Sequence, residues 1–162
     1  MPSVLKFNNN EIIDSSGKVT TSAVPADHII QVQHMFTNTL TLTTSTTFVD
    51  TNIHDKITPV SASSKILILL TDNGGYKGNN LYFVTVVRTI GGTTTDLSAN
   101  NKFNYGYGHS AAFTTAIAYV DEPNTTEEIT YMYQLRTNGG SDGVYQGNGS
   151  ATGSMVLLEI KG

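Results

Sequence analysis

The feature that most constrains the fold of this chain is an alternation of apolar and polar residues with a period of two. In residues 129–136 apolar side chains occupy every second position, and residues 39–43 alternate in the same way. Because successive side chains of a strand point to opposite faces of a sheet, the pattern predicts half-buried β-strands. We expect Leu40 and Leu42 to point inward.

Further strand-like runs are spaced by about ten to fifteen residues, with turn residues between them. They cover residues 30–36, 48–57, 65–70, 82–87, 112–120 and 154–160. In residues 30–36, Ile30, Val32 and Phe36 share one face, and the two glutamines share the other. Eight or nine such strands predict an all-β protein, an antiparallel β-sandwich of jelly-roll-like type.

Residues 66–70 form an unbroken apolar run followed by Asp72-Asn73-Gly74-Gly75. An apolar run of strand length favours either a central strand buried on both faces or a strand under a subunit contact. The residues after it tolerate positive φ, so they predict a turn.

The first 27 residues are polar and carry only scattered apolar positions. Residues 14–17 predict a turn between short extended pieces at 5–7 and 18–20. Such a segment buries too little apolar area to order itself, so we expect it to be disordered or ordered by a partner. This divides the chain into an N-terminal anchoring arm, 1–27, and a sandwich domain, 28–162.

Composition excludes several classes of function. The chain has no Cys, which rules out disulfides, thiolate metal sites and thiol nucleophiles. With 9 Lys and Arg against 13 Asp and Glu, its net charge of −4 argues against nucleic acid as a partner. No apolar run approaches the roughly 20 residues of a transmembrane helix, and residues 1–6 lack the pattern of a secretory signal. We therefore expect no membrane insertion.

The polar residues form no catalytic constellation. None of the four histidines has metal-ligand spacing, and the Asp72 turn lacks the further acidic oxygens of a calcium loop. The pairs Asp121-Glu122 and Glu127-Glu128 are adjacent, so in strands their side chains would point apart, which suits glycoside cleavage badly. We expect a protein that is not an enzyme, with no cofactor and no metal. A glycan-cleaving enzyme is the rival class.

Aromatic residues beside Gly or Asn are the remaining candidates for binding. Tyrosine offers a flat apolar body and one hydroxyl, which suits sugars and protein surfaces. The alternative is that these side chains fold back over the ends of the sandwich. The candidate receptor contacts are Tyr76, Tyr105, Tyr107, His109 and Tyr145.

Residues 43–51 (TTSTTFVDT), 57–68 (ITPVSASSKILI) and 156–162 (VLLEIKG) resemble small β-rich virion proteins of marine and cyanobacterial tailed phages, often labelled tail fibre. The resemblance covers about residues 28–162 in order and spacing, through strand-and-turn patterns. It implies a trimeric sandwich on a virion, without cofactor or catalytic residues. Tail-fibre members are often the C-terminal piece of a longer chain, whereas here a 27-residue arm precedes the domain.

Taken together, we expect a homotrimeric capsid decoration or head-fibre protein on the virion surface of a tailed bacteriophage. Residues 1–27 would anchor it to the major capsid protein or to a tail or fibre component. The loops around 72–80, 101–110 and 138–150 would form its exposed end. The alternative is a tail-fibre tip, a receptor-binding protein that adheres to host surface glycan.

Overall fold

The computed structural model is built from β-strands and describes residues 5–7, 10–13, 20, 23–76, 79–98, 102–109, 112–139, 144–146 and 153–162. One sheet contains β3 (Ile29–Thr37), β4 (Thr41–Thr43), β6 (Lys65–Tyr76), β10 (Ala112–Asp121), β12 (Val144–Gln146) and β13 (Gly153–Ile160). The other contains β5 (Val49–Ile57), β7 (Asn79–Ile90), β8 (Thr93–Asp96), β9 (Asn104–His109) and β11 (Ile129–Thr137). Within these residues no helix is long and apolar enough to cross a membrane.

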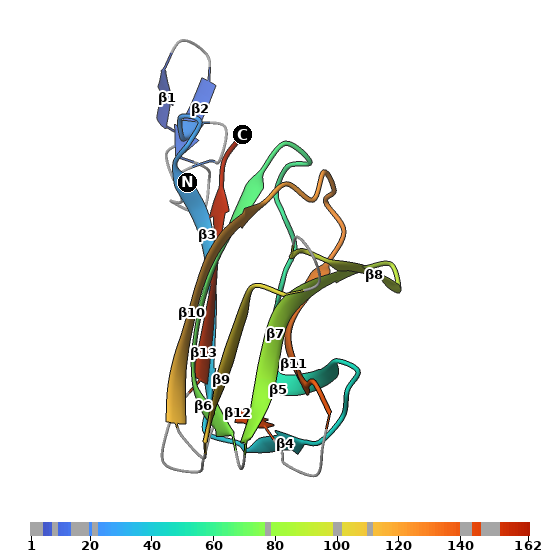
Figure 1. Cartoon of the computed structure of the whole chain (residues 1–162). Helices are drawn as coiled ribbons and strands as arrows, with labels where there is room; N and C mark the ends of the chain where they lie inside the picture. Colours follow the sequence, from blue (N-terminus) through green and yellow to red (C-terminus); the bar gives the residue numbers. More distant parts are fainter. Residues whose placement is uncertain are drawn as a thin grey trace.

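The strand order is that of a jelly roll (Figure 1). In the first sheet β13 lies between β3 and β6, and β10 pairs with the other edge of β6. Beside the last residues of β6, the strand β12 takes the place of β13. The strand β4 pairs with β12 and so takes the place of β3. In the second sheet the order is β5-β11-β7, and β8 and β9 pair with successive parts of β7. Joining the interrupted strands leaves the eight of a two-sheet jelly roll, so the predicted fold is confirmed.

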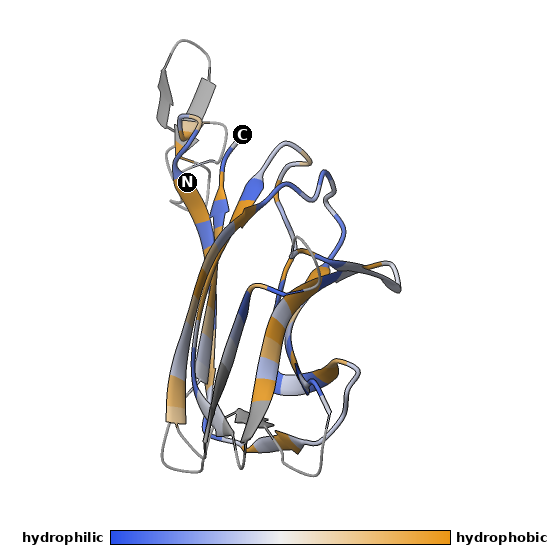
Figure 2. Ribbon diagram, viewed as in Figure 1, coloured by the Kyte–Doolittle hydropathy of each residue, from blue (hydrophilic) through white to orange (hydrophobic). Residues whose placement is uncertain are grey.

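The core lies between the two sheets. Every inward side chain of β11 from Ile129 to Leu135 is at most 2% exposed, as the alternation predicts. The inward residues of β6 and β13 pack against them from the opposite sheet. Figure 2 shows apolar residues along β7, whose Val84 and Val86 are fully or almost fully buried in this core.

Two expectations about the first sheet need correction. Leu40 and Leu42 point outward, about half exposed, and Thr41 and Thr43 take the more buried positions. The stretch after residue 70 is not a turn: Asp72 to Gly75 continue β6. Gly74 pairs with Phe113 on one side and Gln146 on the other, so ladders on both edges hold this glycine-containing segment extended.

The N-terminal segment also differs from expectation. Leu5–Phe7 is a strand (β1), but its partner is β2 (Asn10–Ile13), so the extended piece comes earlier than residues 18–20. The expected turn at 14–17 lies outside the described residues. Nearer the sandwich, three hydrogen bonds tie the residues before β3 to Lys161. The Lys161 carbonyl accepts from Asp27 N–H (2.7 Å), its backbone N–H donates to the His28 carbonyl, and its Nζ donates to the Val24 carbonyl.

Candidate functional site: the outer faces of the sandwich

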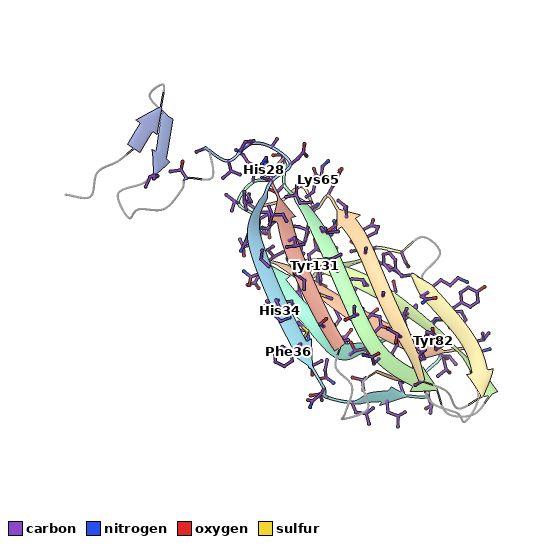
Figure 3. All side chains as sticks on the ribbon, turned by 90° about the vertical axis from the view of Figure 1, so that its left-hand side faces the viewer. His28, His34, Phe36, Lys65, Tyr82 and Tyr131 are labelled. Carbon is purple, nitrogen blue, oxygen red and sulfur yellow. The ribbon has the colours of Figure 1, made fainter. Side chains whose placement is uncertain are left out.

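The two outer faces of the sandwich differ in polarity. On the sheet that contains β6, the outward positions of the central strands are apolar or small, and we call this surface the outer apolar face (Figure 3). The register aligns them in two rows across the strands. The rows are Val32–Leu158–Leu67–Val120 and His34–Val156–Leu69–Ala118. Val32 on the edge strand β3, Val120 on the edge strand β10 and Leu69 on the central strand β6 are 55%, 47% and 38% exposed, so apolar side chains face water across the width of the sheet.

No Asp, Glu, Lys or Arg stands at the outward positions of this face between Lys65 and Asn73 or on the aligned described residues of β3, β13 and β10. The first charges occur at its end, where Lys65 Nζ lies 3.7 Å from Glu122 Oε1. Next to the two rows, the Thr71 and Ser154 hydroxyls hydrogen-bond to each other at 2.9 Å.

The opposite outer face is polar. Lys56 Nζ contacts Glu128 Oε1 at 2.7 Å, and Gln134 Nε2 donates to Asp50 Oδ1 at 2.8 Å. Of its apolar residues, Val87 is only 6% exposed, whereas Tyr105 is 59% exposed. This face therefore has the hydrated character of an ordinary sandwich surface.

Aromatic rings and cations form a cluster on the second sheet. Arg136 lies over Phe83 (4.0 Å to the ring centroid) and Phe48 (5.1 Å), and Lys102 Nζ lies over Tyr105 at 4.7 Å. Phe83 and Tyr105 stack with centroids 6.3 Å apart. Tyr105 remains 59% exposed, so one ring of this cluster is open to a ligand. A flat ring flanked by a cation can stack on a sugar and attract its anionic substituents.

The other candidate contacts lie in strands, not in loops as expected. Tyr76 ends β6, Tyr107 and His109 belong to β9, and Tyr145 belongs to β12. Their backbones meet at one end of the sandwich: Tyr145 pairs with Gly75, Tyr76 with Val144, and His109 with Asn79. This is the end away from the chain termini in Figure 1. Their side chains lie outside what the structure describes.

A buried ion pair with a tyrosine joins the two sheets. Arg88 Nη1 donates to both carboxylate oxygens of Asp121, at 2.7 and 2.9 Å, and the Tyr131 hydroxyl donates to Asp121 Oδ2 at 2.7 Å. Burial, followed by the hydrogen bond to Asp121, raises the pKa of Tyr131 far above its usual value. Asp121, one of the four acids considered for glycoside cleavage, is thus hydrogen-bonded within the fold.

A second polar group lies in the core at Asp72, where the sequence predicts a turn. Asp72 is fully buried, pairs in register with Thr115, and lies near Tyr133. Burial first, and the charge of Asp72 second, raise the pKa of Tyr133 well above its usual value. No group of three or more His, Cys, Asp or Glu suited to a metal ion occurs among the described residues.

The comparisons with known proteins bear on the fold. No protein-family model and no curated protein matches the chain. Among solved structures, a chain from the structure of infectious bursal disease virus, Gx strain, is similar with a TM-score of 0.50 over 85% of this chain. The two are 15% identical, and this chain spans about a third (33%) of the matched one. At that identity the likeness shows a shared fold and nothing finer.

Proposed function

We propose that the chain is a non-enzymatic structural protein of a tailed-bacteriophage virion. In this proposal it is a homotrimeric decoration or head-fibre protein on the particle surface. The observation that carries the proposal is the outer apolar face, an uncharged sheet surface on a chain of net charge −4. Water-exposed apolar surface of this kind is typical of a protein that works in contact with others.

The likeness to a chain of a virus structure and the resemblance to phage virion proteins agree with this role. The buried groups support it too, because Asp121 and Asp72 are used inside the fold and not on an accessible surface. A stable, oligomeric shell component needs a rigid sandwich and a contact surface, and it needs no reaction centre.

Residues 1–27 are proposed as the anchor to the major capsid protein or to a tail component. The bonds from Lys161 hold the chain beside the C-terminal end of β13, so the arm leaves the sandwich at that end. The Tyr76 and Tyr145 backbones lie at the opposite end. A protein anchored through its arm would present that opposite end to the surroundings.

The anchor is tested by deleting residues 1–22, which keeps Val24 and Asp27 and their bonds to Lys161. The shortened chain should keep the oligomeric mass of the full chain and fail to bind particles that lack the protein. The full chain, added to the same particles, is the positive control. Binding of the shortened chain at the level of the full chain would refute the anchor assignment.

The second candidate function is a tail-fibre tip that adheres to host glycan, and the exposed ring of Tyr105 beside Lys102 favours it. Here Tyr105→Ala should abolish binding on a glycan array. Val60→Ala, an exposed apolar residue in the loop after β5, is the matched control. If the unmodified chain binds no glycan, this candidate fails and the decoration role is unaffected.

A further inference from the structure

The most exposed large apolar side chain among the described residues lies on the outer apolar face. Phe36, on the edge strand β3, is 72% exposed. Its only described ring contact is with His34, 6.0 Å away on the same face (Figure 3). Leaving a phenylalanine ring in water forgoes about 1.5–3 kcal/mol of burial, so its position on an apolar sheet face points to a partner surface.

A shallow hollow lies on the same face, across β13, β6 and β10. Its outward lining residues are Ala116 and Ala118 of β10, Leu69 and Thr71 of β6, and Ser154 and Val156 of β13. The small alanine side chains create this hollow, because neighbouring outward positions carry Leu and Val. The hollow is apolar and uncharged, which suits an aromatic ring.

Within one chain Phe36 does not fill the hollow. Register places Phe36 opposite Ser154, Ser154 opposite Thr71, and Thr71 opposite Ala116. One strand spacing therefore separates Phe36 from Ser154, the nearest lining residue, and three, about 14 Å, separate it from Ala116 on the far side. The ring of Phe36 is 72% exposed, so both the ring and the hollow are open to another molecule.

We propose that Phe36 of one copy inserts into the hollow between β6 and β10 of the next copy. This inference rests on the proposed homotrimer and names the surface that forms it. In the proposed homotrimer the contact is heterologous, because Phe36 of each copy meets the hollow of the next and the contact repeats around a threefold axis. A reciprocal twofold pair would also fill both sites, so the ring of three rests on the proposed homotrimer. Three copies complete the ring in the proposed assembly.

Charge and area favour a second copy as the occupant. Copies of a chain with net charge −4 repel each other, and the outer apolar face is where that repulsion is least, because it carries no charged residue at the positions named above. Four strands by about seven residues give roughly 400 Å² at standard strand dimensions. A standard interface takes about 800 Å² from each partner, so the face is the size of an apolar centre with a polar rim around it.

Because the chain has no cysteine, introduced thiols report on this contact alone. In the double variant Phe36→Cys, Ala118→Cys, the two Cα atoms of one copy are three strand spacings and two residues apart, about 16 Å, which is too far for a disulfide within the chain. Mild oxidation of the full-length variant should give covalent dimers and trimers on a non-reducing gel, and no larger species. The matched control Phe36→Cys, Thr130→Cys, with its second thiol on the opposite sheet, should stay uncrosslinked.

A second pair of variants does not depend on thiol chemistry. Ala118→Arg fills the hollow with a charged side chain on an exposed strand position and should reduce the oligomer to monomer. Thr130→Arg, on β11 of the other sheet, should leave the mass unchanged. Circular dichroism verifies that each variant keeps its β-sheet spectrum.

The outcomes separate this inference from the proposed function. If the unmodified chain is trimeric while the double variant does not crosslink and Ala118→Arg stays trimeric, the contact is wrong and the homotrimer stands. If the unmodified chain is monomeric, both fail. Crosslinked species that extend beyond the trimer would also overturn the closed ring.

Discussion

The buried ion pair between Arg88 and Asp121 should stabilise the fold far more than a surface pair of the same length. Both Arg88–Asp121 and Lys56–Glu128 have N–O distances of 2.7 Å, but the side chains are 19% and 6% exposed in the first and 57% each in the second. Asp121→Asn and Glu128→Gln remove one charge from each pair at nearly constant volume. The comparison therefore tests what burial and the additional hydrogen bonds to Asp121 contribute together.

In Asp121→Asn the guanidinium of Arg88 faces a neutral amide in a low-dielectric site. Removing one partner of a buried pair costs about 3–5 kcal/mol. At roughly 2–4 °C per kcal/mol for a chain of this length, Tm should fall by about 6–20 °C. Glu128→Gln should cost less than about 1 kcal/mol, because water already solvates both groups.

The assay is thermal unfolding followed by circular dichroism at one protein concentration, since the stability of an oligomer depends on concentration. The triple variant Arg88→Met, Asp121→Leu, Tyr131→Phe removes all three polar groups together. It should be more stable than Asp121→Asn, because no unpaired charge remains in the core. Equal losses for Asp121→Asn and Glu128→Gln would refute the reasoning.

Two further predictions concern the core. The free energy of unfolding should fall above pH 10, because the raised pKa values of Tyr131 and Tyr133 keep both hydroxyls protonated in the folded chain while they ionise in the unfolded chain. Each of the two tyrosines should lower the free energy of unfolding by about 1.4 kcal/mol per pH unit. Denaturant titrations should show a shallower fall for Tyr133→Phe, and an unchanged slope contradicts the assignment. Gly106→Ala should cost about 1–3 kcal/mol, because its Cβ would lie 2.3 Å from the ring of Tyr82, which stacks on Phe113; a melting curve like that of the unmodified chain argues against this close packing.

The sequence predicted the sandwich well where strands face the core on one side and polar surroundings on the other. In β11 the alternation identified Tyr131 and Tyr133 as inward residues, and both are fully buried. The prediction failed at Leu40 and Leu42, which point outward. Periodicity shows that two faces differ, and it cannot show which one covers the core when apolar residues also line an outer surface.

Turn-forming residues predicted the local backbone less well than strand pairing determines it. Asp72 to Gly75 has the composition of a turn, yet β10 and β12 pair with both edges of this segment and hold it in β6. Tyr105 likewise belongs to a strand, although it is flanked by residues typical of loops. Long-range ladders of this kind leave no local signal. For residues 66–70 the expectation of burial on both faces is wrong, because the structure covers only one face of that run and leaves Leu69 outward. The alternative, a strand under a subunit contact, stays a prediction.

We propose that this sandwich functions as a homotrimer on a larger particle, and its mass in solution decides whether the copies associate. Sedimentation equilibrium of the unmodified full-length chain, over a wide range of concentrations, measures that mass. We expect a mass three times the 17.4 kDa of one chain. A mass of 17.4 kDa at every concentration would show a monomer and exclude the homotrimer.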